Sequence, residues 1–143
     1  MKILRNYKSM VIAAAMAILF LANVGIAYAS NDNIGYSFTI KPYFGNTYSD
    51  GRYRQTTNTS NPWKVNMTYS GEGAGTITTY WLAKFNSSHN VVSGTHNVVQ
   101  GTGAQYFTAN SGAKKTNVCL GAENNNDSPN SYTVSGYWDE ETY

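Results

Sequence analysis

The clearest alternation of apolar and polar residues runs through residues 62–86. Residues 63–70 have a period of two, which predicts a strand with one apolar face made by Trp63, Val65, Met67 and Tyr69. Residues 71–75 form a glycine-rich turn, since glycine permits positive φ at little cost. Residues 76–86 carry apolar side chains at both parities, which predicts a strand covered on both faces. We therefore expect an antiparallel hairpin at the centre of the fold.

The five-residue loop also predicts a register for this hairpin. Ser70 would lie opposite Thr76, and the further pairs would be Tyr69 with Ile77, Met67 with Thr79, Val65 with Trp81, and Trp63 with Ala83. Each pair then joins two odd-numbered or two even-numbered residues, so the apolar faces of both strands lie on the same side of the sheet. This register predicts that Trp81 is among the most buried residues and that Trp81→Ala costs about 3–5 kcal/mol.

Shorter alternating segments predict strands on both sides of the hairpin. Residues 34–41 place Ile34, Tyr36, Phe38 and Ile40 on one face, and Pro42 should end this strand. The other predicted strands are residues 91–100, 104–109, 116–122 and 131–139, followed by an acidic tail, residues 140–143, that we expect to fray. Seven to eight short strands without a helical period predict an all-β fold, an antiparallel β-sandwich of the jelly-roll type.

The first 29 residues have the three parts of a secretory signal peptide. Lys2, Arg5 and Lys8 precede an apolar run, which ends in a small-residue cleavage site between Ala29 and Ser30. An uncleaved anchor is the alternative, because about 20 apolar residues can span a bilayer. The cleavage site favours removal. We therefore expect a secreted, extracellular domain of residues 30–143 without stable membrane insertion.

Charge and cysteine usage narrow the range of partners. Removal of the three basic residues takes the formal net charge from +2 to −1, and no basic stripe remains for nucleic acid. Cys119 is the only cysteine. It cannot form an intramolecular disulfide, and its apolar neighbours favour a buried, inert thiol in a monomer over an intermolecular bridge.

Catalytic and metal-binding patterns are weak in this chain. His89 and His96 are the only histidines, and a dyad of either with Cys119 has no supporting motif. Residues 123–130 (ENNNDSPN) gather oxygen donors that could suit calcium, but their spacing matches no EF-hand and is typical of a turn. We therefore expect no enzymatic activity, no cofactor and no metal.

Aromatic and basic residues gather between the first predicted strand and the hairpin. The candidate ligand-binding residues are Tyr43, Phe44, Tyr48, Arg52, Tyr53 and Arg54. Aromatic rings beside hydrogen-bonding side chains suit stacking on sugars or contact with a protein partner. The competing interpretation is that these rings cover one end of the sandwich, because aliphatic core residues are few.

Three stretches carry a resemblance to a known family: residues 36–53 (YSFTIKPYFGNTYSDGRY), residues 62–86, and residues 121–142 (GAENNNDSPNSYTVSGYWDEET). On these stretches the chain resembles small exported proteins of Gram-positive bacteria that form a domain-of-unknown-function family. No catalytic residue is assigned in that family. In size and style the chain is also similar to lactococcin-type bacteriocins, which implies antagonism between bacteria or binding to the cell envelope.

These patterns together predict a secreted, non-enzymatic binding or bacteriocin-like protein that acts at a bacterial cell surface. Its partner would be a cell-wall or cell-surface component. A structural matrix or surface-coating protein is one alternative, consistent with the composition rich in Tyr and Asn. A small secreted hydrolase that uses Cys119 or a histidine is the other.

Overall fold

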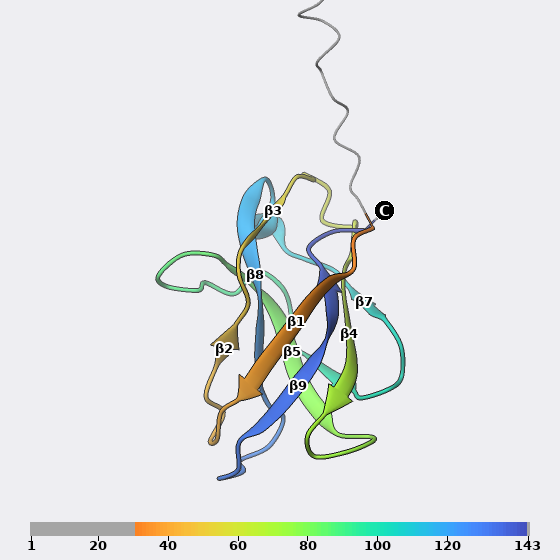
Figure 1. The fold of residues 1–143 in the computed structure, drawn as a ribbon. Coiled ribbons are helices and arrows are strands. Elements are labelled where there is room, and N and C mark those ends of the chain that lie inside the picture. The colour runs from red at the N-terminus through yellow and green to blue at the C-terminus, as the bar shows by residue number, and fades with distance from the viewer. Residues whose placement is uncertain (1–30, 143) are drawn as a thin grey trace, which may run out of the picture.

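The computed structural model describes residues 31–142, so the predicted signal peptide and the cleavage site at Ala29 and Ser30 lie outside the described residues. The described chain forms two antiparallel β-sheets packed face to face (Figure 1). The strands are β1 (Ile34–Ile40), β2 (Thr47–Tyr48), β3 (Arg52–Arg54), β4 (Trp63–Ser70), β5 (Ile77–Lys84), β6 (His96–Val99), β7 (Gln105–Phe107), β8 (Thr116–Asn124) and β9 (Tyr132–Asp139), with one short 3-10 helix, η1 (Ser111–Ala113). No helix within residues 31–142 is long and apolar enough to cross a membrane.

The strand order confirms the predicted antiparallel β-sandwich. One sheet has the order β1-β9-β4-β7, and the other has the order β2-β8-β5-β6, with β3 also paired to β8. If β2 and β3 are taken as one interrupted strand, each sheet has four strands and most connections cross from one sheet to the other. This is the arrangement of a jelly roll.

The core lies between the inner faces of the two sheets. The predicted alternation in β1 is confirmed, because Tyr36, Phe38 and Ile40 are buried while the residues between them are exposed. Opposite them, β5 and β8 contribute Tyr80, Leu82 and Leu120 to the same cluster. Aromatic rings supply a large part of this core, as the composition predicts.

The predicted β4–β5 hairpin is wrong. Strand β4 pairs with β7 and β9 in one sheet, while β5 pairs with β6 and β8 in the other, so none of the predicted pairs from Ser70–Thr76 to Trp63–Ala83 forms. The glycine-rich turn carries the chain across the sandwich, with positive φ at Gly73 and Gly75. The apolar faces of β4 and β5 therefore meet across the core instead of side by side.

A bulge in β4 changes the predicted parity of its last residues. Its register against β9 shifts between Met67 and Tyr69. Beyond the shift Tyr69 is 54% exposed, whereas Ser70 is buried. The expectation that Tyr69 shares the apolar face of Trp63, Val65 and Met67 is therefore wrong at this one position, because the extra residue turns its side chain outward.

The predicted burial of Trp81 is confirmed, although its location differs. Trp81 is 3% exposed and forms a small second cluster with Ala83 and Cys119, against which Tyr48 packs. This cluster lies apart from the main core, on the parity of β5 opposite to Tyr80 and Leu82. The prediction that β5 is covered on both faces is thus confirmed.

Two further segments differ from the sequence-based expectation. Only His96–Val99 of the predicted strand 91–100 is a strand, preceded by isolated bridges at Val91 and Ser93. The acidic tail is not frayed up to Thr142, since Glu140 and Glu141 are 6% and 2% exposed. Their carboxylates are held by Arg52 and by backbone N–H groups, partners that the local sequence does not reveal.

Candidate functional site

A groove opens along one edge of the sandwich, between β1 of one sheet and the β2–β3 segment of the other. Its volume is about 310 Å³. It is lined by residues 34–38 of β1, by Trp138 of β9, and by Tyr48, Ser49, Asp50 and Arg52. Sites of a few hundred Å³ with aromatic walls and a few polar groups are suited to small or extended ligands.

The groove exists because both sheets end here in edge strands. Among the described strands β1 pairs only with β9, and β2 and β3 are two and three residues long. The turn between β2 and β3 packs closely against Phe85 at Gly51, where an added Cβ would lie 2.3 Å from Cδ1 of the ring. Ser49 bridges the interruption, since its N–H donates to the Leu120 carbonyl at 2.9 Å and its Oγ accepts from the Leu120 N–H at 3.0 Å.

Tyr48 forms one wall of the groove and is fixed by other rings. Its ring stacks on His89 with centroids 3.9 Å apart and meets Trp81 edge-on at 6.1 Å. His89 adopts a positive φ of 43°, an uncommon conformation for a residue other than glycine. The Tyr48 ring is therefore held in place by His89 and Trp81 before any ligand binds.

Arg52 closes the other end of the groove and is held by two carboxylates. Its Nε donates to Glu140 Oε2, and its Nη2 lies 3.1 Å from Asp32 Oδ2. The hydrogen bond to Glu140 raises the pKa of Arg52, with burial acting in the opposite direction. The guanidinium is thus fixed in place, and its side chain is still 27% exposed.

The connection from β1 to β2 presents two adjacent aromatic rings, which we call the aromatic tip (Tyr43 and Phe44). The two side chains are 65% and 46% exposed. Both residues adopt positive φ, 53° and 56°, which is unfavourable for bulky side chains. The Tyr43 N–H donates to the Ser128 carbonyl at 3.0 Å and anchors this turn. Because this turn adopts an unfavourable backbone conformation and exposes two rings, we treat it as a candidate binding surface.

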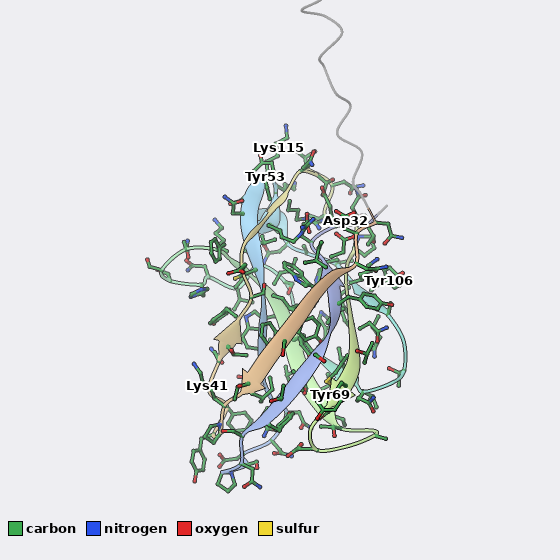
Figure 2. The ribbon with its side chains drawn as sticks, in the orientation of Figure 1. Asp32, Lys41, Tyr53, Tyr69, Tyr106 and Lys115 are labelled. Atoms are coloured by element: carbon green, nitrogen blue, oxygen red, sulfur yellow. The ribbon has the colours of Figure 1, made fainter. Side chains whose placement is uncertain are left out.

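The six predicted ligand-binding residues follow this edge from end to end, but they do not form one cluster. The aromatic tip follows Lys41 in the chain, and Lys41 and Tyr53 lie at opposite ends of the molecule (Figure 2). Tyr48 and Arg52 line the groove between them. Arg54 is only 1% exposed and donates to the carbonyls of Glu140 and Asn61, so it supports the structure from inside.

Comparison with known proteins places this chain in a family. The family described as "Protein of unknown function (DUF2712)" matches residues 23–142. The chain belongs to the DUF2712 family. No curated protein and no solved structure gives a significant match.

Cys119 and His96, on which the hydrolase alternative depends, are both packed into the folded part of the DUF2712 chain. The thiol of Cys119 is buried and lies 3.7 Å from the Ala83 carbonyl oxygen, and burial raises its pKa to about 11. His96 stacks on Phe107 at 3.9 Å, and burial lowers its pKa. Within residues 31–142, no three His, Cys, Asp or Glu side chains gather as a metal site. This arrangement gives the hydrolase alternative no support.

Sequence reasoning missed part of the DUF2712 groove. Gly35, Ser37 and Trp138 line it from the other sheet, and Asp32 and Glu140 fix Arg52. The sequence shows which residues of β1 form its polar face, but it does not show that β1 lies beside β2. Asp32 and Glu140 lie far from Arg52 along the chain, so only the fold brings them together.

Proposed function

We propose that this DUF2712 protein is an exported, non-enzymatic binding protein that acts at a bacterial cell surface, as an envelope-binding or bacteriocin-like protein. The ligand lies along the edge formed by the groove and the aromatic tip. The observation that carries this proposal is the pair of exposed rings at Tyr43 and Phe44 beside a preorganised groove of about 310 Å³.

The chemistry of this edge suits a glycan of the cell wall. Exposed ring faces such as those of the aromatic tip can cover the apolar faces of sugars. Asp50 and Arg52 supply an acceptor and fixed donors for hydroxyl groups. Because Arg52 is already paired with Glu140 and Asp32, the groove does not require a strongly anionic ligand.

Binding of the purified protein to isolated cell walls tests this proposal, together with growth inhibition across a panel of bacteria. Tyr43→Asn with Phe44→Asn removes both rings, and asparagine tolerates positive φ. We expect this double variant to weaken binding at least about tenfold, since exposed rings at the centre of a contact dominate its energy.

The matched control removes two rings of similar exposure elsewhere. Tyr69 and Tyr106 are 54% and 53% exposed and lie away from the groove edge (Figure 2). Tyr69→Thr with Tyr106→Thr should leave binding unchanged. No binding to any cell wall and no growth effect in the panel would contradict the proposal, as would equal losses in both double variants.

A structural coat protein is the second candidate, and one observation favours it. Within the described residues β1 pairs on one side only, and Ile34–Ile40 contains no charged residue that would discourage another strand from pairing. Sedimentation velocity at rising concentration tests this candidate. Ordered polymers would favour the coat protein, and a monomer at every concentration would count against it.

A further inference from the structure

Three strand ends meet at the end of the sandwich where the described chain ends (Figure 1). Lys64 of β4 lies directly opposite Asp139 of β9 in the register of the sheet. Strand β1 flanks β9 on its other side, and Asn31 precedes the start of β1. Asp139 and Lys64 therefore lie on neighbouring strands, and Asn31 lies in the segment that leads into the strand on the other side of β9.

The amine of Lys64 is placed against a side-chain amide. Lys64 is 3% exposed, and its Nζ donates to Oδ1 of Asn31. The same Nζ lies 3.9 Å from Oδ2 of Asp139 and 5.9 Å from the centre of the Tyr137 ring. The Asn31 amide carbon is one bond beyond the oxygen that Nζ touches, so a nucleophile and a carbonyl face each other.

Asp139 has the properties of a buried proton-transfer group. It is fully buried, and its Oδ1 accepts from the Glu141 N–H at 3.2 Å. Its Oδ2 has no hydrogen-bond partner among the described residues. Burial raises the pKa of Asp139 to about 7, and the Glu140 charge adds to this, although the Glu141 N–H, Lys64 and the Asp32 N–H act in the opposite direction. A large fraction of this carboxyl is therefore protonated at neutral pH.

An ordinary buried ion pair does not explain this arrangement. Buried charges that stabilise a fold are held in short, charge-assisted hydrogen bonds with their oxygens satisfied. Here the ammonium and the carboxyl are 3.9 Å apart, and the carboxyl oxygen nearest to the amine has no hydrogen bond. The closest polar contact of the amine is instead the neutral amide of Asn31.

We propose that Lys64 and Asn31 become joined by an intramolecular isopeptide bond and that Asp139 transfers the protons. Transfer of one proton from the Lys64 side chain to Asp139 starts the proposed reaction, and it leaves a free amine beside a neutral carboxyl. The Nζ lone pair attacks the Asn31 amide carbon while the Asp139 carboxyl donates its proton toward Oδ1. Asp139 then takes a proton from Nζ and passes it to the leaving amide nitrogen. As the bond to that nitrogen breaks, the carbonyl forms again and the proton on Oδ1 returns to Asp139. The new C–N bond replaces the old one, one ammonia molecule is released, and nothing is oxidised or reduced.

The position of Asn31 also suits this reaction. The residue is exposed, so the ammonia that forms can leave into solvent and the reverse reaction is not favoured. The bond closes the loop between residues 31 and 64 and ties the start of the described chain to β4 across the end of β9. A cross-link that closes a loop restricts the unfolded chain and stabilises the fold. This inference does not depend on the proposed ligand.

Mass spectrometry of the purified product from the full-length chain tests the cross-link. We expect a mass lower than that of the sequence, from its observed N-terminus, by one ammonia molecule. Trypsin should not cut after Lys64, since the side chain is an amide. A branched peptide should join the segment that contains Asn31 and ends at Arg52 to residues 55–84. The unmodified mass with cleavage after Lys64 would overturn the proposal, as would loss of ammonia without the branched peptide.

Variants separate the three roles. Lys64→Arg and Asn31→Ala should each restore the mass of the sequence and lower the melting temperature. Asp139→Asn should do the same, because an amide cannot shuttle the proton, and an undiminished cross-link in this variant would overturn the role of Asp139. Lys114→Arg and Asn33→Ala are the matched controls and should keep the mass deficit. The result for the unaltered chain decides the question even if a variant fails to fold.

Discussion

Five charged residues among residues 31–142 are almost completely buried: Arg54, Lys64, Asp139, Glu140 and Glu141. They gather at one end of the sandwich, where buried charges require partners. Glu141 shows how this requirement is met, because its two carboxylate oxygens accept from the N–H groups of Gln55 and Thr56 at 3.0 and 2.8 Å. The tail thereby supplies hydrogen-bond acceptors for N–H groups of the loop that follows β3.

The burial of Asp139 predicts how its carboxyl titrates in the folded protein. Burial keeps the proton on the native carboxyl up to about pH 7, whereas the unfolded chain releases it near pH 3.8. The contribution of Asp139 to the free energy of unfolding is therefore fully present below about pH 4 and is lost as the pH rises to about 7. Carbon-detected NMR of the side-chain carboxyl should show a midpoint near 7. A midpoint below about 5 would contradict the burial of this group.

Strand β4 contains one irregularity, the bulge between Met67 and Tyr69. Its bulge lies opposite Gly136 of β9, where an added Cβ would lie 1.8 Å from the Asn66 carbonyl oxygen. The bulge turns Tyr69 outward and Ser70 inward. Because the obstacle is backbone, it cannot move aside as a flexible side chain could.

Gly136→Ala should therefore destabilise the fold by about 3 kcal/mol or more, since the two strands must separate to admit the methyl group. Chemical denaturation of the variant measures this loss. Gly35→Ala in the neighbouring strand is the control, because its nearest neighbour would be the Gly136 oxygen at 3.9 Å, an ordinary contact. We expect a change within about 0.5 kcal/mol there. Equal effects of the two substitutions would show that the close approach at Gly136 is not present in solution.

The whole molecule is held by two apolar clusters. The main core fills the space between the sheets, and the smaller cluster of Trp81, Ala83 and Cys119 lies under Tyr48. Cys119 is fully buried in this second cluster. Reaction of its thiol with a reagent therefore reports unfolding of the protein around it.

Modification of Cys119 by a thiol reagent should be slow in the native protein. Burial raises its pKa to about 11 and also blocks access, so modification should require unfolding. The rate should rise with denaturant along the unfolding transition. Ser87→Cys in a Cys119→Ser background places a thiol at an exposed turn and should react rapidly without denaturant. Rapid labelling of native Cys119 would show that the second cluster opens independently of the rest of the fold.

The sequence alone predicted the all-β class, most strands, and which residues of β1 face inward. These follow from local alternation, because a strand places successive side chains on opposite faces whatever its partner is. The sequence also indicated the groove edge through Tyr48 and Arg52. It identified Cys119 as buried from its apolar neighbours. Trp81 is buried as predicted, but the hairpin register from which its burial was predicted does not form.

Only the tertiary structure decided which strands pair. Alternation in β4 and β5 fits a hairpin as well as two strands that face each other across a core, since both bury the same side chains. The choice depends on contacts with β8 and β9, which follow much later in the chain. The groove wall from β1, the partners of Arg52, and the meeting of Asn31, Lys64 and Asp139 have the same origin. Sites built from distant segments leave no local pattern, because their geometry is set when the sheets close.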